Sequence, residues 1–163
     1  MDKDAFFSCL RSALEAIRHP QYFEDERAYQ GALIAQLTAH IPSGVMPTNG
    51  IIQQEPQKTL ARHHLNLRPD VIVHEPYDSA HHRGRNEGNH VVIELKRRAT
   101  MAAALEDFES LDAMLNVLNY PLGIFLNIGS ADSFSRAVPE RLRARITCLA
   151  VELGSDRVVS IRN

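Results

Sequence analysis

RPDVIV, at residues 68–73, and VVIELKR, at residues 91–97, are the two stretches that decide the fold of this chain. Both are rich in β-branched residues, which predicts buried strands, yet they contain Asp70, Glu94 and Lys96. Burial of an unpaired charge costs several kcal/mol, so charged side chains in such strands need a partner. A divalent metal ion is the simplest partner for two carboxylates.

The alternation of side chains along a strand sharpens this expectation. Val92, Glu94 and Lys96 share one face of their strand, and pairing of the two strands would let Asp70 and Glu94 converge on one cation. Two carboxylates completed by water suit Mg²⁺, so we expect Mg²⁺ or Mn²⁺ as the cofactor. Lys96 would stand beside the ion as a point charge for a phosphate or an attacking hydroxide.

Pro69-Asp70 followed by Glu94-Leu95-Lys96 resembles the motif of the PD-(D/E)XK nuclease superfamily, which includes restriction endonucleases and Holliday junction resolvases. The resemblance implies an α/β fold with a restriction endonuclease-like core in the order α-β-β-β-α-β, in which helices flank a central mixed sheet. It also implies that Asp70 and Glu94 are metal ligands, with the Leu95 carbonyl as a further ligand. Lys96 would then lie near the nucleophilic water.

Many members of that superfamily carry a Glu on the first core helix, and Glu26 is the candidate here. Glu26, Gln30, Leu33 and Leu37 recur at helical spacing and share one face. If the two leucines bury against the sheet, Glu26 could orient a water ligand or support a second ion, and Gln30 could position a phosphate or a water. The alternative is that Glu26 only occupies the first helical turn, where acidic residues suit the macrodipole.

Hydrophobic periodicity predicts the order of the elements. Helices are expected over residues 4–18, 24–40 and 101–118, and strands over residues 51–57, 68–74, 90–97, 122–128, 145–153 and 157–162. The helix over 101–118 is expected to bury one apolar stripe: Leu105, Phe108, Leu111, Leu115 and Leu118. We expect one nuclease-like domain over 1–163, with a preliminary helix in 1–20, the core in 24–128 and C-terminal strands in 144–162.

Composition limits the class of protein. The 163 residues are 44% hydrophobic, which suffices for one domain with a real core. Because the apolar runs are too short to span a membrane and the first residues do not resemble a secretory signal, we expect a cytoplasmic protein with no membrane partner. Cys9 and Cys148 lie far apart and are expected to be reduced core residues.

Basic residues near the motif are the candidates for nucleic-acid contacts. Arg68, Arg97 and Arg98 adjoin the motif residues, and Arg83 and Arg85 lie in the polar loop over 75–89, which is expected to lie close to the site. The formal net charge of −2 argues for modest affinity. The acidic residues of the helix over 101–118 are expected to face away from a phosphate backbone or toward a protein partner; they are Glu106, Asp107, Glu109 and Asp112.

Two functional hypotheses follow from these residues. The first is a metal-dependent endonuclease that hydrolyses phosphodiester bonds in DNA by means of metal-activated water, with a possible homodimer that would cut two strands. The second is a catalytically silent protein of the same fold that serves as a nucleic-acid or protein binding module. The acidic net charge favours the second hypothesis, and the intact set of Asp70, Glu94 and Lys96 favours the first.

Overall fold

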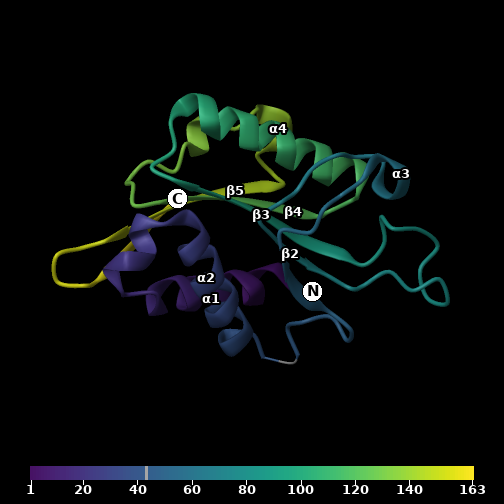
Figure 1. Cartoon of the computed structure of the whole chain (residues 1–163), viewed down its shortest axis with the longest axis horizontal. Coiled ribbons are helices and arrows are strands. Elements are labelled where there is room, and N and C mark those ends of the chain that lie inside the picture. The colour runs from purple at the N-terminus through teal and green to yellow at the C-terminus, as the bar shows by residue number, and fades with distance from the viewer. Residues whose placement is uncertain (43) are drawn as a thin grey trace.

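A six-stranded mixed sheet with helices on both faces forms the centre of the computed structural model, which describes residues 1–42 and 44–163 (Figure 1). The strands lie side by side in chain order: β1 Ile51–Gln54, β2 Val71–His74, β3 Asn89–Arg97, β4 Leu122–Ile128, β5 Ile146–Leu153 and β6 Val159–Arg162. The strands β3, β4 and β5 are parallel, whereas β1, β2 and β6 run antiparallel to their neighbours. The predicted α/β class is therefore confirmed.

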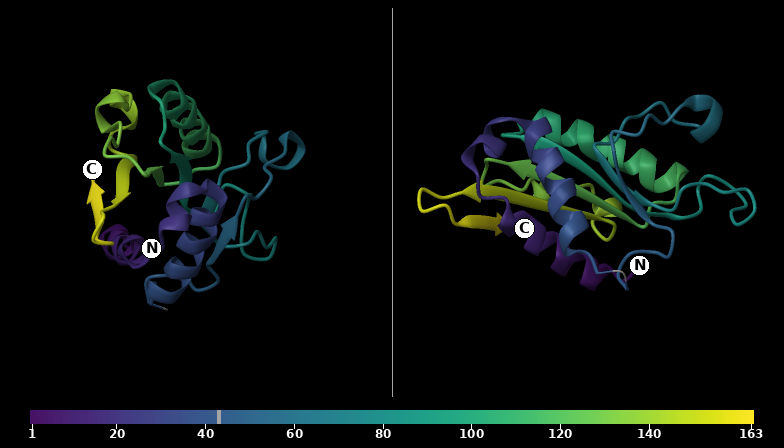
Figure 2. Two further views of the ribbon diagram at one scale, coloured as in Figure 1. Left: turned by 60° about the vertical axis from the view of Figure 1, so that its left-hand side comes forward. Right: turned by 60° about the horizontal axis from the view of Figure 1, so that its bottom comes forward.

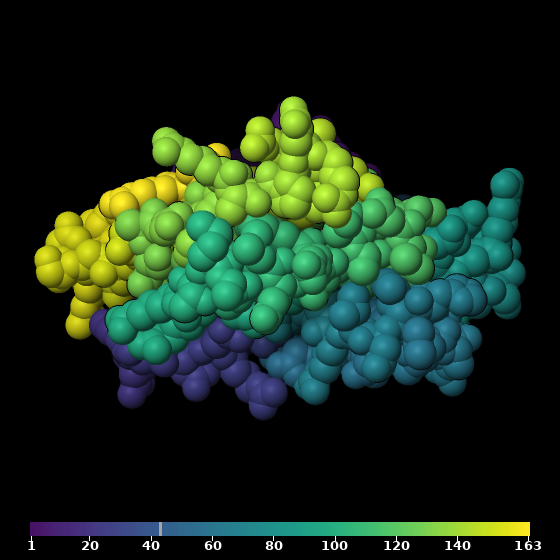
Figure 3. All heavy atoms as spheres, turned by 90° about the horizontal axis from the view of Figure 1, so that it is seen from above, coloured from purple at the N-terminus to yellow at the C-terminus, as the bar shows by residue number. Residues whose placement is uncertain are grey.

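Helices cover the two faces of the sheet as separate layers (Figure 2). The helices α1 Lys3–Ala16 and α2 Glu26–His40 pack on one face, with the short 3₁₀ turn η1 Pro20–Glu24 between them. The helix α4 Met101–Val117 covers the other face, beside the 3₁₀ turns η2 Ser135–Ala137 and η3 Glu140–Leu142 (Figure 3). From α2 to β4 the order is helix, strand, strand, strand, helix, strand, interrupted only by the four-residue helix α3 Leu60–His63.

Each long helix begins at a side chain that accepts hydrogen bonds from the first turn. Asp2 caps α1, Asp25 caps α2 by accepting from the Ala28 N–H at 2.7 Å, and Thr100 caps α4. Such caps satisfy backbone donors that have no partner within the helix. The cap at Asp25 fixes the start of α2, and with it the direction in which Glu26 leaves the helix.

The two faces of the sheet form two hydrophobic clusters. On the α1 and α2 side, Leu33 and Leu37 are fully buried, as predicted, among side chains of all the central strands. On the α4 side, Ile72, Val92 and Phe125 of the sheet pack against Phe108 and other residues of α4. Since strand residues alternate between these clusters, Val92, Glu94 and Lys96 share the α4 side.

The stripe predicted for α4 is wrong at one position. Leu105 is 42% exposed, whereas Ala104 and Asp107 are buried together with Phe108 and Leu111. Leu105 follows Ala104 directly and therefore lies about 100° around the helix from it, outside the face that meets the sheet. The presence of Asp107 on the buried face has consequences for the site described below.

Several predicted boundaries also shift. The first strand ends at Gln54 because Glu55 takes a left-handed conformation with φ of 44°, and the second begins only at Val71. The strand over residues 122–128 and the start of the helix at Met101 agree with the prediction. Within the described residues, no helix is both long and apolar enough to cross a membrane, and neither cysteine takes part in a disulfide.

Candidate functional site

The site is built at the end of β3 that extends beyond its neighbour β2. Pairing of the two strands begins where Val71 faces Ile93, so on this side the part of β3 after Ile93 has no partner strand among the described residues. Its backbone N–H groups still need acceptors, because an unpaired buried donor is costly. Side chains from two other segments supply them.

Two carboxylates close this free end of β3. The Leu95 N–H donates to Asp70 Oδ2 at 2.7 Å, and the Arg97 N–H donates to Glu26 Oε2 at 2.9 Å. Gln30, one turn further along α2, donates through Nε2 to the Asp70 carbonyl at 2.6 Å. The structure thus brings Glu26, Gln30 and Asp70 together at the end of the strand that carries Glu94 and Lys96.

Asp70 and Glu94 form a tightly coupled pair of acids. Burial raises the pKa of Glu94 well above its usual range, and the nearby carboxylates of Asp70 and Asp107 raise it further. Burial also raises the pKa of Asp70, although the Leu95 N–H and the ammonium of Lys96 oppose that shift. Both groups therefore resist ionisation unless a cation is close, which is the electrostatic condition expected at a metal site.

Lys96 lies at the centre of the acidic groups. Burial alone would lower the pKa of Lys96, but the carboxylates of Asp107, Glu26 and Asp70 outweigh it and raise that pKa. Its Nζ lies 3.8 Å from Asp107 Oδ1. The ammonium is therefore charged over the whole neutral range and is directed toward α4.

Asp107 is the residue that the sequence prediction missed. With the other acids of its helix it was expected to face away from a phosphate backbone or toward a protein partner, but it is only 8% exposed and its carboxylate lies beside Lys96 at the site. Burial raises the pKa of Asp107 to about 7, and its Oδ2 is buried without a hydrogen-bond partner among the described residues. Its position three residues after Ala104 and four before Leu111 could have revealed it, because both neighbours are apolar.

A polar cleft opens beside these residues. It has a volume of about 430 Å³, and charged or amide side chains line it: Asp25, Glu26, Arg27, Gln30, Glu55, Arg68 and Asp70. These residues come from the start of α2, the end of β1 and the segment before β2. The cleft therefore gives a ligand access to Asp70 from the α2 side.

Three of the predicted nucleic-acid contacts lie near the site, but each is already paired. Arg68 forms an ion pair with Glu55 in the cleft. Arg97 forms an ion pair with Glu24 and donates through Nε to the Phe23 carbonyl at 2.9 Å. Arg98 Nη2 lies 3.9 Å from Glu24 Oε1. A phosphate would have to compete with these carboxylates.

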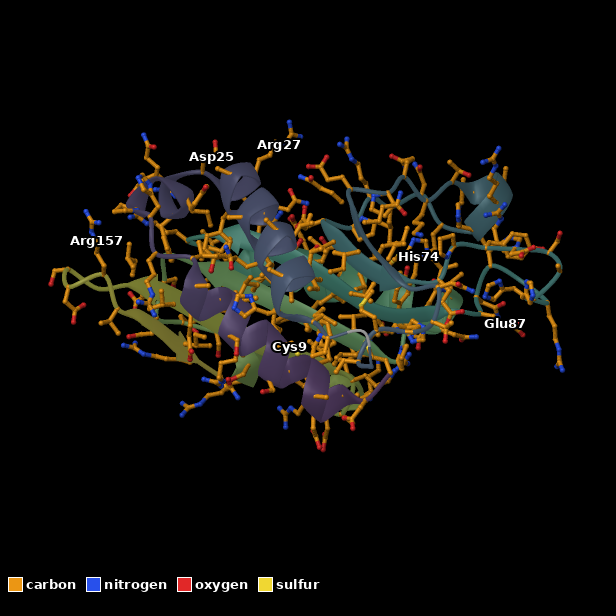
Figure 4. All side chains as sticks on the ribbon, turned by 90° about the horizontal axis from the view of Figure 1, so that it is seen from below. Cys9, Asp25, Arg27, His74, Glu87 and Arg157 are labelled. Atoms are coloured by element: carbon orange, nitrogen blue, oxygen red, sulfur yellow. The ribbon has the colours of Figure 1, made fainter. Side chains whose placement is uncertain are left out.

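The expectation that Arg83 and Arg85 lie close to the site is wrong. Their loop joins the opposite ends of β2 and β3, and the strand from Asp70 to His74 alone spans roughly 13 Å. Figure 4 shows Glu87 of this loop well away from Asp25 and Arg27 at the start of α2. The Arg85 guanidinium instead stacks 4.5 Å from the centre of the Tyr77 ring.

The donor set decides which metal the site would accept. Among the described residues, no three His, Cys, Asp or Glu side chains converge closely enough to form a ready-made cage. Asp70 and Glu94 do lie close together, since the charge of Asp70 helps to raise the pKa of Glu94. Two carboxylates with water completing the shell suit Mg²⁺ or Mn²⁺.

Comparison with protein-family models finds no match to this chain, and comparisons with curated proteins and with solved structures find none either. The function must therefore be argued from the chemistry of these side chains.

Proposed function

We propose that this chain is a metal-dependent endonuclease with a restriction endonuclease-like core, which hydrolyses phosphodiester bonds in DNA. The observation that carries the proposal is the meeting of Glu26, Gln30 and Asp70 with Glu94 and Lys96 at the free end of β3. The order of elements from α2 to β4 supports the core, since it follows the expected α-β-β-β-α-β sequence apart from the insertion of α3.

Asp70 and Glu94 would hold the Mg²⁺ or Mn²⁺ ion. The Leu95 carbonyl is a suitable further ligand, because the N–H and C=O of one strand residue point to the same side and the Leu95 N–H already points at Asp70. When bound, the ion supplies Lewis-acid activation of a water and neutralises charge on the phosphoryl group. Asp70 and Glu94 would both be ionised when they hold the ion, because a nearby cation favours the charged form of each carboxyl group.

The remaining residues orient the reactants. Lys96 keeps its positive charge and would stabilise the negative charge that develops on the phosphoryl oxygens and on the attacking oxygen. Glu26 is fixed by the Arg97 N–H, so its second oxygen is free to orient a water. Gln30 holds the Asp70 backbone through its amide, which makes it a positioning residue rather than a direct phosphate contact.

Nicking of supercoiled plasmid tests the proposal. We expect cleavage with Mg²⁺ or Mn²⁺, none with EDTA, and a loss on the order of 100-fold in Lys96→Ala, as for removal of one transition-state donor. Lys3→Ala is the matched control, because it removes an exposed lysine at the start of α1 whose Nζ donates to the Pro121 carbonyl at 3.3 Å. Cleavage by Lys96→Ala at the wild-type rate would reject the assigned role of Lys96.

The silent binding module is the second candidate, favoured by the net charge of −2. Thermal unfolding with and without Mn²⁺ separates the two candidates. A ligand that binds only the folded chain must raise its stability. We expect Mn²⁺ to raise the melting temperature of the wild type and to have no such effect on Glu94→Gln. No shift in the wild type, together with no nicking, would favour the binding module.

A further inference from the structure

Two groups of side chains line the cleft beside Asp70. Arg27, Glu55 and Arg68 are linked to one another by ion pairs. The others are Asp25, Glu26 and Gln30 from the start of α2, together with Asp70 itself. A phosphodiester that reached Asp70 through this cleft would therefore pass two guanidinium groups.

A single carboxylate holds both guanidinium groups. Arg27 Nη2 lies 3.4 Å from Glu55 Oε1, and Arg68 forms an ion pair with Glu55 Oε2. The side chain of Glu55 is 17% exposed, whereas those of Arg27 and Arg68 are 75% and 55% exposed. Each guanidinium has five N–H donors in a planar fork, so both arginines keep donors directed toward solvent and the cleft. Figure 4 shows Arg27 extending outward from the start of α2.

The position of Glu55 is fixed relative to the site. Its backbone N–H donates to the Asp70 carbonyl at 2.8 Å, the same oxygen that accepts from Gln30. Its left-handed conformation, uncommon for a residue other than glycine, turns the chain out of β1 at this point. The carboxylate of Glu55 and the two arginines are thus tied to the backbone of a proposed metal ligand.

We propose that Arg27 and Arg68 form a phosphate-binding wall for a DNA strand that enters the cleft, and that Glu55 competes with the phosphate for both arginines. The proposal deepens the nuclease function and rests on it for the identity of the ligand. Guanidinium groups bind phosphate oxygens with paired, charge-assisted hydrogen bonds, which makes arginine the preferred residue for this contact. Glu55 then lowers the affinity, because its carboxylate occupies some of the donors of both guanidinium groups and repels the phosphate.

The charge of the cleft adds a second consequence. Four carboxylates line it against two guanidinium groups, so the cleft repels a polyanion when no cation is bound. Replacement of Glu55 by an uncharged residue lowers that repulsion and frees both arginines at once. The wild type should therefore bind DNA weakly in EDTA, and the Glu55→Gln variant should bind more tightly.

Fluorescence anisotropy with a short fluorescein-labelled DNA duplex tests the wall without requiring cleavage. In EDTA at low salt we expect Glu55→Gln to tighten binding at least about fivefold, and Arg27→Gln and Arg68→Gln each to weaken it by a similar factor. Loss of each arginine should also reduce the slope of log K against log salt by about 1. Thermal unfolding of each variant checks that the fold is intact.

Arg157→Gln is the matched control. It removes the same charge from the turn between β5 and β6, which Figure 4 shows at the opposite end of the molecule from the loop that carries Glu87. Equal weakening by Arg157→Gln and Arg27→Gln would overturn the proposal, because the effect would then be one of net charge. Failure of Glu55→Gln to bind more tightly than the wild type, or no binding by either, would also overturn it. If the wild type shows no metal-dependent nicking but the variants bind DNA as expected, the nuclease function would be rejected and the phosphate-binding wall would stand.

Discussion

Lys96 is surrounded by acids, and three of them, Asp70, Glu94 and Asp107, resist ionisation. Burial is the first cause of the raised pKa of Glu94, Asp70 and Asp107, and their mutual repulsion adds to it for Glu94. Four carboxylates, including Glu26, act on Lys96 and favour its charged form. Buried acids of this kind lower the stability of the folded chain, since well-packed apolar residues in their place would cost less free energy. The proposed metal ion would offset this cost, because a nearby cation favours the ionised form of each carboxyl group.

The raised pKa of Asp107 predicts a pH dependence of stability. Because the folded chain holds this proton more tightly than the unfolded chain, stability falls as the pH rises from about 4 to about 7, by up to about 1.4 kcal/mol per unit. The Asp107→Asn variant has no carboxyl group at this position, so its stability does not fall with rising pH in this way. We expect the variant to gain more stability over the wild type near pH 8 than near pH 5.

Urea unfolding at the two pH values measures this difference. Glu109→Gln, an exposed acid on the same helix, is the control and should show no pH-dependent gain. The same stability gain for Asp107→Asn at both pH values would contradict the assignment of a raised pKa.

At this scale the sequence predicts part of the site. Strand alternation placed Glu94 and Lys96 on one face, and the spacing of Glu26 and Gln30 from two buried leucines predicted that they point toward the sheet. The bond from the Leu95 N–H to Asp70 was beyond prediction, because it exists only where one strand outlasts its neighbour. The length of β2 is decided by tertiary packing rather than by local propensity.

Among the elements, β3 determines where chemistry can occur. Its nine residues extend past the four residues of β2, and the exposed backbone donors at its end attract carboxylates from α2 and from the segment before β2. Asp70 therefore has two roles that one substitution can separate. It accepts a hydrogen bond that closes the strand, and it offers an oxygen to a cation.

We expect Asp70→Asn and Asp70→Ala to differ in stability although both abolish nicking. The amide oxygen of Asn can still accept from the Leu95 N–H, whereas Ala leaves that donor unpaired at a cost of about 1–3 kcal/mol. Urea unfolding of the two variants measures the gap. Equal stability would show that the bond to Leu95 contributes nothing to the fold and that Asp70 serves the site alone.

The elements also show which boundaries a sequence can predict. The strand β4 agrees with the prediction because all seven residues are buried, so its apolar run is continuous. The end of β1 and the start of β2 differ from the prediction. Glu55 leaves β1 in a left-handed conformation, and Asp70 directs its side chain to the backbone of β3. Both departures occur at the cleft.

In the whole molecule, two apolar layers, one on each face of the sheet, hold the strands that carry the site. Cys148 lies on β5 in the layer that α4 covers, where burial raises the pKa of its thiol to about 12. Cys9 lies on α1 and is partly exposed. Since only the thiolate reacts, the reactivity of Cys148 reports on the packing of the layer that α4 covers.

Alkylation by iodoacetamide near pH 8 should therefore modify Cys9 and spare Cys148. We expect the native protein to react at Cys148 on the order of 100-fold more slowly than at Cys9, and the difference to vanish in urea. Mass spectrometry counts the labels, and a Cys9→Ala variant isolates the slow site. Similar rates in the native protein would mean that the layer under α4 opens readily.

Because Asp70 and Glu26 close the free end of β3, selection for a stable sheet is enough to retain them, whether or not any DNA is cut. Lys96 contributes in another way, through its ion pair with the carboxylate of Asp107. If the proposed cleavage were lost, Asp70 and Glu26 would still be retained by their contribution to the sheet, whereas Lys96 would be retained only by its ion pair with Asp107. A relative that has Asp70 and Glu26 but another residue in place of Lys96 would have kept the closed end of β3 without the proposed cleavage.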